Sequence, residues 1–317
     1  MKKQLKIGSR GSPLALAQVA LVEAALVKHF PDLECKFVII TTSGDWKPED
    51  GEVRLAERAG GKAQFAKEIE EALLSGAIDC AVHSMKDMDS FLPQGLVIDH
   101  MLAREDVRDV LLLSDDHRSK DSSSLDILPH GASIGTVSVR RAAFLKAKRP
   151  DLNFVPFRGN VQTRIDKLRA GQVDATLLAR AGLNRLGLAH EGDMIFSVDD
   201  MLPASGQGAV GIEVREGDDN VIAFFSRISS LNTVFCVKSE RAVLKALNGS
   251  CHSPIGAYAV IENGQMWLRA CVASLDGTVI IHDDIRGHVS TVEQAQTLGR
   301  EIGLRMKAIL PKGILEA

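Results

Sequence analysis

The chain repeats one local pattern three times: a short apolar run, a small polar residue, and then a helical stretch. The polar residues are Ser12, Ser138 and Asn160, and all three residue types favour the N-terminal cap of a helix. Strands that alternate with helices in this way are typical of α/β domains built on largely parallel sheets. The part of the chain before Gly217 is therefore predicted to be α/β.

Arginines lie in or next to the first turn of each of these predicted helices. Arg10 precedes the first cap, Arg140 and Arg141 follow the second, and Arg164 follows the third. The helix dipole opposes a positive charge at a helix N-terminus. A fold tolerates that arrangement more readily when an anion lies between them, so we expect anions at these helix starts.

The segment 140–185 is strongly basic, although the whole chain of 317 residues has a formal charge of −3. Its eight arginines and three lysines oppose three aspartates, which gives 11 − 3 = +8. Arginine suits bidentate binding of carboxylate or phosphate. The cations are Arg140, Arg141, Lys146, Lys148, Arg149, Arg158, Arg164, Lys167, Arg169, Arg180 and Arg185.

Composition excludes several classes of protein. The N-terminus lacks the continuous apolar run of a signal peptide, and no uncharged apolar stretch approaches membrane-spanning length. Five cysteines form no C-x-x-C pair, which argues against a disulfide framework and a zinc site. We therefore expect a cytoplasmic protein without metal. The cysteines are Cys35, Cys80, Cys236, Cys251 and Cys271.

A second polar stretch, residues 83–87, follows the predicted strand 78–82. Open α/β sheets bind ligands at the carboxyl ends of their strands, so Lys86 and Asp87 are candidate site residues. The alternative is an ordinary surface pair. A Schiff base at Lys86 ranks lower, because nothing nearby resembles a pyridoxal phosphate site. Residues 44–63 are polar and without period, as in a long loop.

Residues 206–211 match G-x-G-x-x-G, but the match does not predict a dinucleotide site. That motif needs a preceding strand and a following helix, whereas a proline-containing stretch precedes and a strand pattern follows.

Beyond Gly217 the pattern changes to helices and two hairpin signals, Asn263-Gly264 and Asp276-Gly277, and predicts a small α+β domain. Cys251 lies in a polar turn there and is either a reactive or attachment site or a spare thiol.

Seven stretches, in this order, resemble the porphobilinogen deaminase family, also called hydroxymethylbilane synthase. They are residues 9–18 (SRGSPLALAQ), 81–87 (AVHSMKD), 138–141 (SVRR), 157–164 (FRGNVQTR), 181–187 (AGLNRLG), 202–213 (LPASGQGAVGIE) and 251–258 (CHSPIGAY). The resemblance implies two α/β domains of the periplasmic-binding-protein type and a small C-terminal α+β domain. The implied boundaries are 1–102 with 206–226, 107–202, and 229–317, with crossings near 103–106 and 203–205.

The resemblance also implies the chemistry. A dipyrromethane cofactor is attached to Cys251 through a thioether and primes the head-to-tail condensation of four porphobilinogen molecules. Each unit loses ammonia to give an electrophilic azafulvene, and hydrolysis finally releases linear hydroxymethylbilane. Asp87 matches the catalytic carboxylate. Lys86, Ser138, Arg140 and Arg141 match cofactor ligands, and Arg10, Ser12, Arg158, Arg164 and Arg185 match residues around the substrate and the growing chain.

The chain departs from the family pattern at Val137, Ala63, Gln64, Arg180 and Ser250, and in the Met-Asp-Ser-Phe stretch after Asp87. None of these removes a named catalytic or attachment residue. Two other classes of protein fit the sequence less well. A non-catalytic polycarboxylate- or phosphate-binding protein would not need Cys251. A nucleic-acid binder is disfavoured by the acidic total charge and the apolar positions of the three phenylalanines in the basic segment. We expect a monomer that binds porphobilinogen, with no nucleic-acid or membrane partner.

Overall fold

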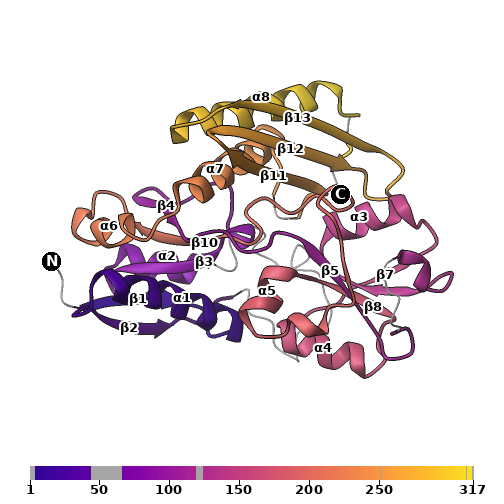
Figure 1. The fold of residues 1–317 in the computed structure, drawn as a ribbon, viewed down its shortest axis with the longest axis horizontal. Helices are drawn as coiled ribbons and strands as arrows, with labels where there is room; N and C mark the ends of the chain where they lie inside the picture. Colours follow the sequence, from indigo (N-terminus) through magenta and orange to yellow (C-terminus); the bar gives the residue numbers. More distant parts are fainter. Residues whose placement is uncertain (1–3, 44–65, 119–123, 251, 312, 316–317) are drawn as a thin grey trace.

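The computed structural model describes residues 4–43, 66–118, 124–250, 252–311 and 313–315. These residues form three sheets (Figure 1). The predicted loop 44–63, Ala63, Gln64 and Cys251 lie outside the described residues.

The first sheet has the strand order β2-β1-β3-β10-β4. Strand β1 is parallel to β2 and β3, whereas β10 is antiparallel to both of its neighbours. The strands are β1 (Gln4–Ser9), β2 (Glu34–Ile39), β3 (Cys80–Ser84), β10 (Val210–Arg215) and β4 (Leu96–Met101). The helices of this unit are α1 (Pro13–His29), α2 (Lys67–Leu74), the 3₁₀ helix η3 (Met85–Asp87) and α6 (Asp219–Ser226).

The second sheet repeats this arrangement in the order β7-β6-β8-β5-β9. Three strands are again parallel, and β5 is again inserted antiparallel to both neighbours. The strands are β7 (Asn153–Val155), β6 (Ser133–Gly135), β8 (Ala175–Ala179), β5 (Asp109–Leu113) and β9 (Met194–Ile195). The helices are η4 (Leu125–Ile127), α3 (Val139–Lys148), α4 (Val161–Arg169), α5 (Arg180–Arg185) and η5 (Ala189–Glu191).

The chain passes between these two sheets twice, before β5 and before β10. The two crossing segments are hydrogen-bonded to each other. The Leu102 amide donates to the Val210 carbonyl at 3.1 Å, and the Glu105 amide donates to the Gly208 carbonyl at 3.2 Å. A side chain at 208 would meet the Glu105 carbonyl oxygen at 2.5 Å, so the crossings approach this closely because residue 208 is glycine.

The third sheet is an antiparallel meander, β11-β12-β13, against which α7 and α8 pack. Its elements are β11 (Ile255–Glu262), β12 (Gln265–Ala273), β13 (Ile280–His288), α7 (Leu231–Ala246) and α8 (Val292–Ile309). The first predicted hairpin is confirmed, since Glu262 pairs with Gln265 around Asn263 and Gly264, which have φ values of 51° and 75°. Two α/β units and a small α+β unit confirm the predicted fold class.

All three predicted helix caps are confirmed. The Ser12 hydroxyl accepts from the Ala15 amide, the Ser138 hydroxyl from the Arg141 amide, and the Asn160 side chain from the Thr163 amide. The expectation for residues 206–211 is also confirmed, because they lead into β10. In contrast, the sequence patterns did not predict β4 or β5. Asp109 follows the implied crossing at 103–106 in the charged stretch 104–109, which does not look like a buried strand. Asp109 nevertheless lies in β5 and is fully buried.

Among the described residues, no single helix is long and apolar enough to cross a membrane. Helices α6 and α7 meet that criterion only as a pair, bent by 110° at the break between them.

The side chain of Glu240 on α7 forms hydrogen bonds with both crossings and with the third sheet. Its carboxylate accepts two hydrogen bonds from Arg104, at 2.5 and 3.0 Å. It also accepts from the amides of Gly206 at 2.7 Å and Ala259 at 2.9 Å. The side chain is fully buried. One carboxylate therefore holds the first crossing, the second crossing and β11 together.

We expect Glu240→Ala to lower the free energy of unfolding by about 3–5 kcal/mol, because Arg104 would remain buried without its counter-charge. Urea unfolding followed by circular dichroism measures this change. The control is Lys148→Ala, which removes an exposed ion pair with Asp200 and should cost less than about 1 kcal/mol. Equal unfolding midpoints for the two variants would contradict the role assigned to Glu240.

Candidate active site

A cavity of about 680 Å³ lies where the first two sheets face each other. It is lined by the starts of α1 and α4, by the turn after β3, by α5 and by the second crossing. The predicted site residues on its wall are Arg10, Ser12, Lys86, Asp87, Arg141, Arg158, Arg164 and Arg185. Residues from distant parts of the sequence thus converge on one cavity that is rich in positive charge.

Two capped helix starts contribute to this cavity from opposite sheets. Ser12 caps α1 and Asn160 caps α4, and both line the wall. Gly159 precedes the second cap with a φ of +117°, and a side chain there would meet Thr163 at 2.6 Å. Arg164 Nε donates to the Gly159 carbonyl at 2.9 Å, which holds this arginine beside the helix start. Helix N-termini favour anions, so their position here suits a carboxylate-bearing ligand.

Asp87 ends the 3₁₀ helix that follows β3, and its side chain is exposed to the cavity. It also lines a smaller adjoining cavity of about 70 Å³, together with Arg10 and Ser84. The turn is anchored from both sides. The Met85 amide donates to the Ala209 carbonyl at 3.1 Å, and Arg241 donates to the Met88 carbonyl at 3.0 Å. The carboxylate is therefore presented from a fixed backbone.

Lys86 lies next to Asp87 and is partly buried. Burial lowers the pKa of its ammonium group to about 8, and the nearby charge of Arg141 acts in the same direction against the opposing effect of Asp87. Lys86 therefore loses its proton more readily than an exposed lysine does. A bound anion would favour its charged form.

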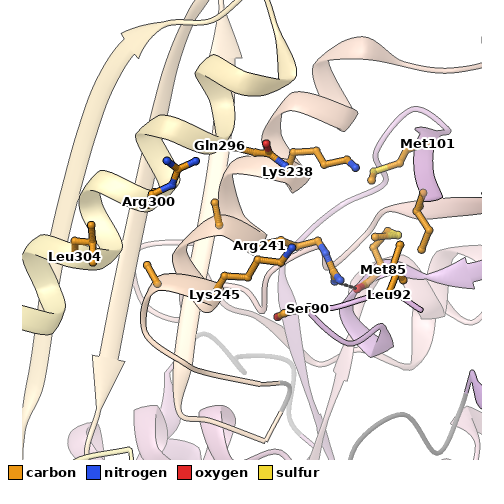
Figure 2. Close-up of a pocket in the computed structure, with 13 residues that line it drawn as sticks. Met85, Ser90, Leu92, Met101, Lys238, Arg241, Lys245, Gln296, Arg300 and Leu304 are labelled. Carbon is orange, nitrogen blue, oxygen red and sulfur yellow. Dashed lines mark hydrogen bonds between the residues drawn. The ribbon is translucent and has the colours of Figure 1, made fainter. Parts of the chain in front are cut away.

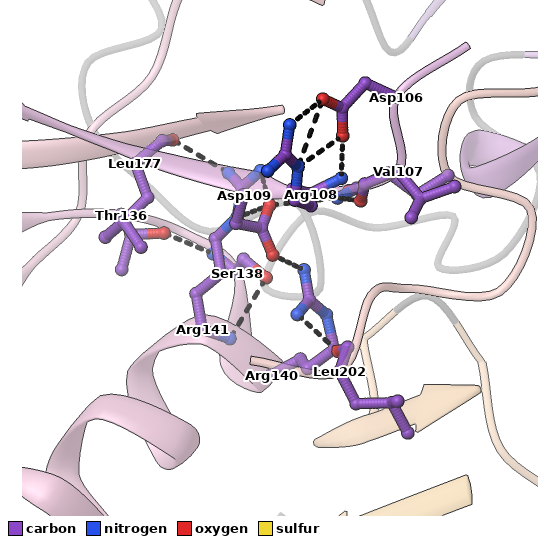
Figure 3. A network of polar contacts seen from close by, with 11 residues as sticks. Asp106, Val107, Arg108, Asp109, Thr136, Ser138, Arg140, Arg141, Leu177 and Leu202 are labelled. Atoms are coloured by element: carbon purple, nitrogen blue, oxygen red, sulfur yellow. Dashed lines mark hydrogen bonds and ion pairs between the residues drawn. The ribbon is translucent and has the colours of Figure 1, made fainter. Parts of the chain in front are cut away.

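Arg140 and Arg141 share a carboxylate of the protein itself (Figure 3). Arg140 Nη2 contacts Asp109 Oδ2 at 2.7 Å, and Arg141 Nη2 contacts Asp109 Oδ1 at 2.7 Å. Burial alone would raise the pKa of Asp109, but the two guanidinium groups outweigh it and hold that pKa below its usual range. The anion at the start of α3 is therefore the Asp109 carboxylate of β5.

Arg140 and Ser138 differ in position from the other candidates. Among the described residues, neither lines the cavity. Arg140 is buried and donates to the Leu202 carbonyl at 2.8 Å, while the Ser138 hydroxyl caps α3. Arg141 both bonds Asp109 and reaches the cavity wall.

Several arginines of the basic segment bind elsewhere. Arg149 pairs with Asp151 at 2.7 Å, and Arg169 pairs with Glu191 at 2.5 Å. Arg180, one of the departures, donates to the Ala189 carbonyl at 2.8 Å. The formal charge of +8 for segment 140–185 is therefore larger than the positive charge that this segment contributes to the cavity wall. Another departure, Val137, lies on the cavity wall.

Sequence models of one family match both parts of the chain. Residues 5–223 match "Porphobilinogen deaminase, dipyromethane cofactor binding domain", and residues 234–308 match "Porphobilinogen deaminase, C-terminal domain". A porphobilinogen deaminase of Chlorobium phaeobacteroides is 42% identical over 303 residues, covering 95% of this chain and 94% of the relative. That of Ruthia magnifica is 41% identical over 316 residues, covering 100% of both. A solved ancestral cationic amino acid solute binding protein aligns at 15% identity and a TM-score of 0.43, covering 70% of this chain and 86% of that protein.

Fold and site together define a two-lobed α/β protein with a basic cavity between its lobes and a small α+β unit at its C-terminal end. The chain belongs to the porphobilinogen deaminase family. It is an enzyme of tetrapyrrole biosynthesis, a hydroxymethylbilane synthase, and its cofactor is dipyrromethane. A cavity of about 680 Å³ lined by arginines and Lys86 fits a group that carries several carboxylates.

We expect Lys86 of cofactor-free protein to lose its proton near pH 8 rather than near 10.5. Its acylation rate at different pH values, followed by peptide mass spectrometry, measures the midpoint, and the exposed Lys307 is the internal control. Loading with dipyrromethane should raise the midpoint, since a bound carboxylate favours the charged form. A midpoint near 10.5 in both states would contradict this environment.

Proposed function

We propose that the cavity between the first two sheets holds the dipyrromethane cofactor and the growing pyrrole chain, with Cys251 as the thioether attachment site. The observation that carries this proposal is the convergence of Arg10, Lys86, Asp87 and Arg164 from both α/β units on one cavity. When bound, dipyrromethane supplies the pyrrole carbon to which porphobilinogen units are added. The domain boundaries proposed with it are 1–102 with 206–226, 107–202 and 229–317.

The cationic wall binds the acetate and propionate groups of substrate and product chain. Arg10 and Ser12 act from the first sheet, and Arg158, Arg164 and Arg185 act from the second. Arg158 is buried, and burial lowers the pKa of Arg185. Both groups are therefore poorly solvated, which strengthens their attraction for a carboxylate that excludes water. Because the residues act from both lobes, ligand carboxylates would bridge the sheets.

Asp87 is the proposed catalytic carboxylate. Its place on an anchored turn at the edge of the cavity suits a group that must face successive pyrrole rings without moving. A carboxylate there stabilises positive charge that develops at a pyrrole nitrogen, and it can accept and return a proton at each addition.

Lys86, Ser138, Arg140 and Arg141 are the proposed cofactor ligands. Lys86 and Arg141 line the cavity and can reach a cofactor carboxylate directly. Arg140 already bonds Asp109 and Leu202, so its contribution includes holding Asp109 and thereby Arg141 in place. The same proposal includes a cytoplasmic monomer that acts on a small molecule, without nucleic acid or membrane.

We expect Asp87→Asn to keep the fold and the bound cofactor while lowering kcat for porphobilinogen by about 10²–10⁴-fold, the usual contribution of a general acid–base group. Steady-state kinetics of the holoenzyme measures this. Asp89→Asn is the matched control, because its side chain lies two residues away and outside the cavity wall. Near-normal turnover by Asp87→Asn would refute the role given to this carboxylate.

A further inference from the structure

The cations on the wall of the active-site cavity attract any ligand that carries several carboxylates. Porphobilinogen differs from other such ligands in its pyrrole ring, whose two faces are apolar. Ligand pockets generally combine a few charged groups, which orient the ligand, with apolar side chains that contact its frame. A cavity that prefers a pyrrole therefore needs an accessible apolar group among its cations.

Ile39 provides such a group. It is the last residue of β2, and it lines the active-site cavity. Its side chain is 62% exposed. The other large aliphatic side chains on this wall, in the part of the chain that the structure describes, are buried or partly buried. They are Leu14, Val137, Val161 and Leu178.

Ile39 lies beside the residues of the first lobe that are proposed to bind carboxylates. It pairs with Ser9 in the parallel β1–β2 ladder, and β1 leads directly into Arg10 and Ser12. A side chain at Gly11 would lie only 3.1 Å from Ile39 Cγ2, so Ile39 lies against the loop that joins these two residues. An exposed isoleucine elsewhere on a surface would need no explanation. This one lies at the carboxyl end of a parallel strand, where open α/β sheets bind their ligands.

The accessibility of Ile39 distinguishes it from the apolar residues of a second cavity. That cavity, of about 550 Å³, lies between the first sheet and helices α7 and α8 (Figure 2). Its residues Met85, Ile98 and Met101 are at most 2% exposed, because the packing of the protein itself covers them. Arg241 donates to the Met85 carbonyl at 3.4 Å, so this region anchors the turn that carries Asp87. A ligand would gain little apolar contact there, whereas it can cover Ile39.

We propose that Ile39 is a specificity-determining residue that packs on one face of the pyrrole ring of porphobilinogen, while Arg10 and the start of α1 bind the carboxylates of the same molecule. This inference rests on the function proposed above for the cavity. The contact removes apolar surface of both the side chain and the ring from water, which stabilises the complex. A polar polycarboxylate without a ring gains nothing from it. Ile39 therefore raises the affinity for a pyrrole relative to other anions.

Isothermal titration calorimetry of the holoenzyme with two ligands tests the proposal. The first ligand is porphobilinogen without its aminomethyl group, which keeps the ring and both carboxylates but cannot lose ammonia. The second is citrate, which offers carboxylates without an apolar ring. Ile39→Ala should raise the dissociation constant of the pyrrole about five- to tenfold and that of citrate less than about twofold. In turnover, the same variant should raise KM for porphobilinogen more than it lowers kcat.

Matched variants locate the effect. Phe37→Ala changes an exposed apolar residue of the same strand outside the cavity wall, and it should bind both ligands like wild type. Ile39→Leu keeps the apolar volume and should keep the affinity for the pyrrole within about twofold. Equal weakening of both ligands by Ile39→Ala, unchanged pyrrole binding in that variant, or the same loss in Phe37→Ala would each overturn the proposal.

Arg164→Gln separates this inference from the function on which it rests. Loss of a charge-assisted hydrogen bond on the cavity wall should weaken both ligands about tenfold. If it weakens neither, the cavity is not the carboxylate site, and the proposed function and the role of Ile39 are both wrong. If it weakens both while Ile39→Ala does not discriminate between them, only the role of Ile39 is wrong.

Discussion

The buried carboxylate of Asp109 is the contact on which the organisation of the basic cavity depends. It binds Arg140 and Arg141 at 2.7 Å each and accepts from Gln207 at 3.0 Å, so it links α3 to the second crossing. Two guanidinium groups beside each other inside a protein would be very unfavourable without such an anion. Asp109 therefore supplies the counter-charge for both buried arginines and holds Arg141 at the cavity wall.

Glu240 plays the corresponding part at the crossings. It binds Arg104 and two backbone amides, and it joins the two lobes to the C-terminal unit. Protein carboxylates thus hold Arg104, Arg140 and Arg141 close to where the lobes meet. The cavity wall also carries Arg10, Lys86, Arg158, Arg164 and Arg185, so it is rich in positive charge.

Several local elements of this structure could be predicted from neighbouring residues in the sequence. The caps at Ser12, Ser138 and Asn160 depend on neighbouring residues alone, and so does the hairpin at Asn263-Gly264, so the sequence was sufficient for them. The sequence did not indicate strand β5, because a charged residue such as Asp109 is unusual in a buried strand and its partners Arg140 and Arg141 lie about thirty residues later in the chain. This ion pairing forms only in the tertiary structure, and no pattern among neighbouring residues indicates it.

The central claim is that a basic cavity between two lobes retains a pyrrole primer attached to the chain. Intact mass spectrometry of the purified, active protein tests it most directly. The account predicts one added dipyrromethane on wild type and none on Cys251→Ala, with porphobilinogen consumption lost in that variant. An active protein with an unmodified thiol at position 251 and no bound pyrrole would contradict it.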